Sequence, residues 1–228
     1  MSLVLDLLFP PRCPFCRRAV EEDGTLCADC QASLPWRLGR RAHRRVELLE
    51  DCAGALDYRG PVRGCIHRFK FYRKRGYARL LGTLTAQCAR DHFPQAFDVV
   101  SWPPLSPRGL RRRGFDQAQL LARSAAACWG VPAEATLRKI RHNRAQSSLD
   151  DPAQRRQNVR GVYAPLHPER TAGRRFLLID DVCTTGSTLA SAAGALTEAG
   201  AACVVCAALA GGHAPQGVEP SSHPPDFF

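Results

Sequence analysis

The clearest hydrophobic pattern in the chain is a run of four apolar residues, 176–179, which ends at two adjacent acids. A turn rich in hydroxyl groups and glycine follows at 184–188, and small residues suited to a helix then fill 189–199. A short apolar run bounded by turn residues is typical of a buried strand. This part of the chain is therefore predicted to fold as a strand, a sharp turn and a helix.

Similar patterns predict the other elements of the body. Strands are expected at 51–58, 97–102, 134–137 and 202–208, with 97–102 as the first strand of the sheet core. A helix is expected at 118–128, and two more within 62–89, interrupted near Gly76. The apolar residues that suggest this last pair are Ile66, Phe69, Leu80, Leu81, Leu84 and Cys88. Alternating strands and helices predict a parallel α/β sheet flanked by helices, with its ligand crevice at the carboxyl ends of the strands.

The two ends of the chain and one internal segment differ in character from this body. Residues 1–9 are apolar but lack a basic leader, so we expect an amphipathic helix, and no stretch approaches the roughly 20 apolar residues of a membrane span. Residues 138–160 are polar and suggest a mobile lid. We expect an N-terminal helix and zinc module at 1–45, the body at 46–212, and a disordered tail at 213–228.

Four cysteines near the N-terminus have the spacing of a metal site. They form two CxxC pairs separated by ten residues: Cys13, Cys16, Cys27 and Cys30. Each pair can present two thiolates to one metal, so the set predicts a structural Cys₄ zinc site in a small module. Two unrelated reduced pairs or a redox motif are the alternatives. The odd total of eleven cysteines, without a secretion signal, points to a reducing cytoplasm.

The strand–turn–helix segment also carries candidate chemistry. A helix N-terminus preceded by a glycine turn binds anions through backbone N–H groups, and hydroxyl side chains add donors. The acid pair suits sugar hydroxyls or a hydrated Mg²⁺ ion better than a bare phosphate. The alternative is an ordinary helix cap. We therefore expect a sugar-phosphate pocket formed by Asp180, Asp181, Thr184, Thr185, Gly186, Ser187 and Thr188.

The net charge of +11 is carried almost wholly by arginine, which suits phosphate recognition but also reflects genome base composition in some organisms. Two basic segments stand out. In the loop 106–117, at the end of a predicted strand, Arg113 is the candidate for holding a second anionic group. The stretch 70–75 mixes basic and aromatic residues and suits phosphate or single-stranded nucleic acid, although a solvated helix face explains it equally well.

The segment FLLIDDVCTTGST resembles the phosphoribosyl pyrophosphate (PRPP) signature of type I phosphoribosyltransferases. The resemblance implies a PRPP or other ribose phosphate ligand bound with Mg²⁺, and catalytic roles for Asp180 and Asp181. Type I enzymes for purine bases have an acid at the position of Thr184, so this residue argues against purine salvage.

The order of motifs along the whole chain resembles the ComF family of bacterial competence-associated proteins. LLFPPRCPFC, RGFDQAQLLA and the QSSL…RRQNVRGVY segment carry this likeness, together with the PRPP signature. It implies phosphoribosyl transfer to an unidentified acceptor, linked to DNA uptake, with single-stranded DNA or competence machinery as partners. The alternative is a non-catalytic nucleotide- or DNA-binding adaptor. Asp116 stands where the family usually has Asn. Candidates for the pyrophosphate and the lid are Arg113, Gln117, Gln146 and Arg155.

Overall fold

A computed structural model of the chain describes residues 11–22, 25–43, 51–72, 74–94, 96–141 and 161–212. At its centre lies a sheet of four parallel strands in the order β1-β6-β5-β2. The strands are β1 (Asp51–Asp57), β2 (Val99–Ser101), β5 (Arg175–Cys183) and β6 (Cys203–Gly211). Because β5 and β6 are the two inner strands and are covered on both faces, their sequences are apolar over most of their length.

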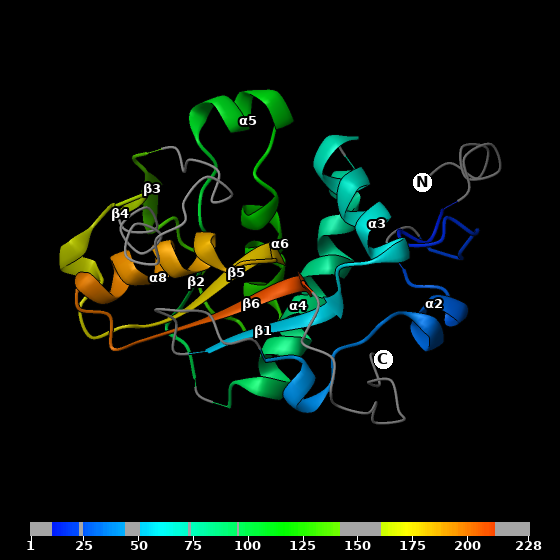
Figure 1. The fold of residues 1–228 in the computed structure, drawn as a ribbon, viewed down its shortest axis with the longest axis horizontal. Helices are drawn as coiled ribbons and strands as arrows, with labels where there is room; N and C mark the ends of the chain where they lie inside the picture. The colour runs from blue at the N-terminus through cyan, green and yellow to red at the C-terminus, as the bar shows by residue number, and fades with distance from the viewer. Residues whose placement is uncertain are drawn as a thin grey trace, which may run out of the picture.

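Helices cover both faces of this sheet (Figure 1). Helices α4 (Ala78–His92) and α6 (Gln117–Ala127) pack on one face, and α8 (Ser187–Glu198) packs against β5 and β6 on the other. The predicted parallel α/β sheet flanked by helices is therefore confirmed. The remaining elements are α2 (Ala28–Ser33), η1 (Gly39–Arg41), α3 (Gly60–Phe71), η2 (Arg75–Tyr77), α5 (Pro107–Arg113), η4 (Pro168–Arg170), and a separate antiparallel ribbon of β3 (Leu137–Lys139) and β4 (Tyr163–Pro165).

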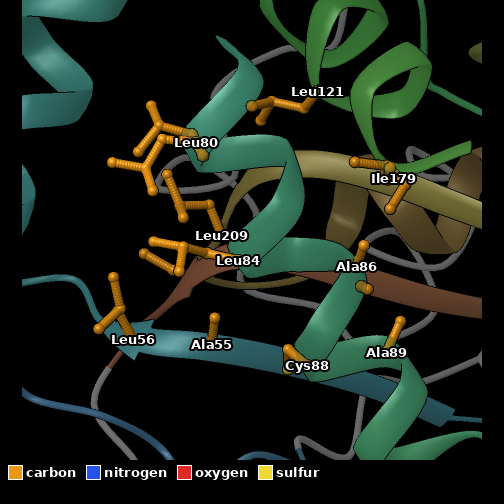
Figure 2. Packing of buried hydrophobic residues seen from close by; sticks show 14 of the residues in the cluster. Ala55, Leu56, Leu80, Leu84, Ala86, Cys88, Ala89, Leu121, Ile179 and Leu209 are labelled. Carbon is orange, nitrogen blue, oxygen red and sulfur yellow. The ribbon is translucent and has the colours of Figure 1, made fainter. Parts of the chain in front are cut away.

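The face under α4 and α6 contains one continuous hydrophobic cluster. Figure 2 shows Leu80 and Leu84 of α4 in this cluster with Leu121 of α6, Leu209 of β6 and Leu56 of β1. The helical spacing seen in the sequence accounts for this packing, because it places apolar residues on one side of each helix. All the residues that suggested helices at 62–89 are buried: Ile66, Phe69, Leu80, Leu81, Leu84 and Cys88.

The N-terminal module shares this cluster with the body. Cys13, Phe15 and Leu34 belong to the same set of buried residues as the helices above. The segment that follows the module runs antiparallel to β1, with bridges from Trp36 to Leu56 and from His43 to Ala53.

Within the segment that joins module and body, Arg37 is buried against the sheet. Its guanidinium donates a hydrogen bond of 2.7 Å to the carbonyl oxygen of Gly212. Arg37, Ala42 and His43 therefore contact the strands of the sheet, while Gly39 and Arg40 are exposed. The expected domain boundary at 45/46 falls within 44–50, outside the described residues, and stays a prediction.

Three expectations about strands need correction. β5 does not end at Ile179 but continues through both acids to Cys183, since Asp180 pairs with Ala208 and Cys183 with Gly211. The strand expected at 97–102, as the first strand of the sheet core, is β2, which lies at an edge of the sheet. β1, which precedes it in the chain, belongs to the same sheet. The strand expected at 134–137 begins only at Leu137 and pairs with β4 outside the main sheet, although Glu134 still donates a backbone hydrogen bond to Val100 of β2.

The predicted N-terminal helix at 1–9 and the predicted tail at 213–228 lie outside the described residues. Among the helices that the structure describes, none has both the length and the apolar character needed to cross a membrane.

The contact between α4 and α6 is close enough to require glycine at position 82. A Cβ atom there would overlap the Cβ of Ser124 and lie 2.9 Å from the carbonyl oxygen of Leu121. Overpacking of this kind usually costs about 1–3 kcal/mol. We therefore expect Gly82→Ala to lower the free energy of unfolding by that amount, as measured by urea denaturation.

The matched control for this variant is Gly194→Ala in α8. A Cβ at position 194 meets open space. Because alanine favours helix over glycine by about 1 kcal/mol, Gly194→Ala should be neutral or stabilising. Equal effects of the two substitutions would contradict the packing described for Gly82.

Candidate functional site

The two acids of the candidate site lie near the carboxyl end of β5 and point to opposite faces of the sheet. Side chains alternate along a strand, so Asp181 follows Leu177 and Ile179 on the α4/α6 side, while Asp180 follows Leu178 toward α8. Asp181 is buried and forms an ion pair of 2.8 Å with the Nζ atom of Lys70, from the last turn of α3. The backbone N–H of Asp181 donates to the Oδ1 atom of Asp180 at 2.8 Å.

The charge state of Asp180 is set by its surroundings. Burial raises the pKa of Asp180 well above its ordinary value, and the negative charge of Asp181 raises it further, while Lys70 partly offsets both effects. A carboxylate at this position is therefore costly without a cation or hydrogen-bond donor beside it. Perturbed carboxyl groups of this kind are concentrated at functional sites.

The turn after β5 has the geometry expected for an anion site. Gly186 has a φ of 80°, a left-handed conformation that favours glycine, and α8 begins at the next residue. Thr184 and Thr185 are exposed, and the Thr185 and Ser187 hydroxyl oxygens lie 3.0 Å apart. Thr188 is half-buried in the first turn of α8. The N-terminus of a twelve-residue helix thus follows the end of the strand that carries the acid pair.

Arg113 lies beside the same site, at the end of α5. Its Nη1 atom donates a hydrogen bond of 2.8 Å to the Oε1 atom of Gln117, and its guanidinium lies 5.6 Å from the ring centre of Phe71. Phe71 is the last residue of α3, so this contact places the end of α5 next to the end of α3. Gln117 is itself buried and orients Arg113.

Asp116 has a structural role that accounts for an acid at this position. Its carboxylate accepts from the backbone N–H groups of Leu105 at 2.8 Å and Gln119 at 3.3 Å, and it caps the N-terminus of α6. Burial raises the pKa of Asp116, although these backbone hydrogen bonds oppose the shift. Asp116 is therefore the N-cap residue of α6.

Two site residues come from the β3–β4 ribbon and were missed from the sequence. Lys139 and Tyr163 are paired across the ribbon, and the Nζ atom of Lys139 lies 5.4 Å from the centre of the Tyr163 ring. Burial lowers the pKa of Lys139, the nearby charge of Asp180 opposes this, and Arg113 adds to it. Burial raises the pKa of Tyr163, and the charge of Asp180 raises it further. The one signal in the sequence that could have identified Lys139 is that it is the single lysine of the stretch 138–160.

Lys70 was also overlooked as an individual residue, although the basic stretch that contains it was noted. Two other predicted residues, Gln146 and Arg155, lie outside the described residues and stay predictions. The structure thus pairs Lys70 with Asp181 and places Lys139 within reach of the charges of Asp180 and Arg113, while the turn 184–188 follows the acids along the chain.

The four predicted metal ligands are gathered in one place. The Sγ atoms of Cys13, Cys16, Cys27 and Cys30 all lie within 4.8 Å of one another. A tetrahedral zinc site with Zn–S bonds of about 2.3 Å places its sulfur atoms about 3.8 Å apart, so the cluster fits zinc. Four thiolate ligands leave no open coordination position, which is typical of a structural site.

Comparison with known proteins finds two domain families in the chain. Residues 4–45 match the double zinc ribbon domain family, and residues 75–227 match the phosphoribosyl transferase domain family. DNA utilization protein YhgH of Salmonella typhimurium is 30% identical over 199 residues, 84% of this chain and 86% of that protein. Competence protein F of Haemophilus influenzae is 30% identical over 202 residues, 78% of this chain and 87% of that protein.

The chain belongs to the ComF family. Competence protein ComFC of Bacillus subtilis is a further relative, 30% identical over 196 residues, which cover 85% of this chain and 74% of that protein. A solved structure of the allosteric regulatory enzyme of purine biosynthesis aligns at a TM-score of 0.40 with 26% identity, over 58% of this chain and 25% of that enzyme's chain.

The raised pKa of Asp180 in this ComF family protein has a measurable consequence. Above about pH 4 this carboxyl group ionises in the unfolded chain but stays protonated in the folded protein. Ionisation therefore stabilises the unfolded chain, and the free energy of unfolding falls as the pH rises. We expect Asp180→Asn to raise the melting temperature at pH 7 by about 2–5 °C in thermal denaturation. The gain should shrink as the pH is lowered toward about 5.

Asp98→Asn is the matched control for this measurement. Asp98 lies beside the first residue of β5, where hydrogen bonds from Arg175 lower its pKa to about 2. Removing that carboxylate makes the same change of charge at a group with the opposite pKa shift, so it should not raise the melting temperature. A melting temperature of Asp180→Asn at or below that of wild type at pH 7 would contradict the electrostatics described here.

Proposed function

We propose that this protein binds PRPP in the cytoplasm and transfers its phosphoribosyl group to an acceptor, with release of pyrophosphate. The observation that carries the proposal is the order of the elements: Asp180 and Asp181 lie near the carboxyl end of β5, and the turn 184–188 and the N-terminus of α8 follow that end of the strand. Carboxylates suited to sugar hydroxyls and a helix end suited to an anion are the groups that a sugar phosphate requires. The match to the phosphoribosyl transferase domain family supports this assignment.

Each group of site residues has a role in this proposal. Asp180 and Asp181 bind the ribose hydroxyls, and the turn 184–188 binds the 5′-phosphate through backbone N–H and hydroxyl groups. Arg113, Lys70 and Lys139 face the pyrophosphate, where their charges act on a strongly anionic group. Carboxylate oxygens also suit Mg²⁺, which Asp180 and Asp181 would hold and which would neutralise part of the pyrophosphate charge.

The reaction requires little covalent chemistry from the protein. The bond between C1 of the ribose and pyrophosphate oxygen breaks, its electron pair leaves with the pyrophosphate, and the acceptor nucleophile bonds to C1. A proton of the acceptor passes to water. The side chains contribute by positioning the sugar and stabilising the charge of the leaving group. Relatives named for DNA utilization and competence suggest that this chemistry serves DNA uptake.

Calorimetry with PRPP and Mg²⁺ tests the binding step. We expect wild type to bind and the double variant Asp180→Asn/Asp181→Asn to lose at least about tenfold in affinity, because two charge-assisted contacts are removed. Asp98→Asn, remote from the turn at the other end of β5, should bind like wild type. A pyrophosphate-release assay across candidate acceptors then tests transfer. Wild type that does not bind PRPP would refute the proposal.

A second function, a non-catalytic adaptor for single-stranded nucleic acid, is favoured by one surface feature. Phe71 and Tyr72 at the end of α3 are 50% and 65% exposed, which is unusual for large aromatic side chains. His67 lies 4.8 Å from the Phe71 ring, between ring centres, and Arg113 lies on Phe71 as well. Exposed aromatic rings next to cations are the usual means of binding unpaired bases.

A DNA-binding titration at several salt concentrations tests the adaptor function. Stacking contributes about 1–3 kcal/mol for each base, so Phe71→Ala/Tyr72→Ala should weaken binding of a poly-dT oligonucleotide at least about fivefold, without changing the salt dependence. Lys74→Gln, which removes an exposed charge nearby, should instead reduce the salt slope by about 0.7. Unchanged affinity in the aromatic double variant would rule out this surface.

A further inference from the structure

Helix α3 lies between the two sites described above. Figure 1 shows it between the N-terminal module and the carboxyl ends of the central strands. Its apolar side is held firmly in the core, since Cys65, Ile66 and Phe69 are completely buried. Two basic residues near its end, Arg68 and Lys70, are half-buried and contact parts of the protein other than this core.

Arg68 is bonded to the zinc module. Its Nη2 atom donates to the carbonyl oxygens of Pro14 and Phe15, at 2.7 Å and 3.0 Å. These two residues are the ones between Cys13 and Cys16, so the guanidinium binds the backbone of the first CxxC pair. Hydrogen bonds from a charged donor are stronger than neutral ones, and Phe15 is buried, which fixes the pair against α3.

Lys70 is bonded to the acid pair. It follows Arg68 by two residues, and at about 100° per residue the two side chains leave the helix about 160° apart. Its ammonium group forms the 2.8 Å ion pair with Asp181 described above, with both side chains largely buried. One turn of helix therefore connects the metal ligands on one side to the ligand-binding carboxylates on the other.

We propose that α3 couples the zinc module to the ligand site, with Arg68 and Lys70 as the positioning residues. Bound zinc fixes the CxxC pair and with it the carbonyl groups of Pro14 and Phe15. Through its hydrogen bonds to these carbonyl groups, Arg68 fixes the end of α3, and this holds Lys70 in position to pair with Asp181. The part of this inference that concerns PRPP rests on the proposed function. By linkage, if bound zinc raises the affinity for the ligand at the Lys70 side, the bound ligand must raise the affinity of the module for zinc by the same factor.

The first test uses the zinc-loaded full chain and Arg68→Met, which keeps the length of the side chain and removes its donors. Arg63→Met is the control, because Arg63 is an exposed arginine on the same helix. After metal analysis shows one zinc per chain, zinc transfer to a colorimetric chelator is followed. We expect Arg68→Met to release zinc about tenfold faster than wild type, and Arg63→Met to behave like wild type.

Hydrogen exchange on the same zinc-loaded proteins tests transmission without any ligand. In Arg68→Met, exchange should accelerate in the peptide covering 11–20 and also in the peptide covering the end of β5, with near-native circular dichroism. In Arg63→Met both peptides should exchange as in wild type. Faster exchange at 11–20 alone would overturn the coupling.

The ligand arm measures reciprocity. PRPP with Mg²⁺ should slow zinc release from wild type, and this effect should vanish in Lys70→Met. Arg68→Met should bind PRPP about five- to tenfold more weakly than Arg63→Met. If wild type binds PRPP but zinc release is insensitive to it, the coupling is wrong. If wild type does not bind PRPP, the proposed function fails, and hydrogen exchange alone decides the coupling.

Discussion

The arrangement of the ligand site depends on one constraint: neighbouring side chains of a strand point to opposite faces of its sheet. Two adjacent acids near the end of an inner strand must therefore lie in different surroundings. Asp181 enters the side covered by α4 and α6 and meets Lys70 of α3 there. Asp180 enters the other side, where its charge acts on Lys139 of the ribbon and burial raises its pKa. One dipeptide thus meets cations from two separate parts of the fold, one on each side of the sheet.

This electrostatic arrangement favours an anionic ligand that carries hydroxyl groups. Two acids close together are unfavourable unless cations or donors compensate them, and the site provides both at its rim. Arg113 is near enough to Lys139 to lower the pKa of that lysine, and two cations close together favour a ligand with several negative charges. PRPP, the ligand proposed above, has these properties.

The zinc module contributes to the same core as the body. A segment of about 40 residues seldom buries enough surface to fold alone, and here Cys13 and Phe15 pack with the helices of the larger domain. Arg37 and Arg68 add hydrogen bonds from charged donors to backbone carbonyl groups across the junction. Zinc binding therefore stabilises part of the main core, and not only a separate ribbon.

The sequence by itself determined the elements whose signals are local. Cys13, Cys16, Cys27 and Cys30 identify a metal site through spacing, and apolar periodicity identified α4 and α6, because such patterns reflect burial of one helix face. It could not place Lys70 against Asp181 or show that β5 continues through its acids, since both depend on partners distant in the chain. Tertiary structure alone decided which basic residues reach the acid pair, because only packing brings α3, α5 and the β3–β4 ribbon to the end of one strand.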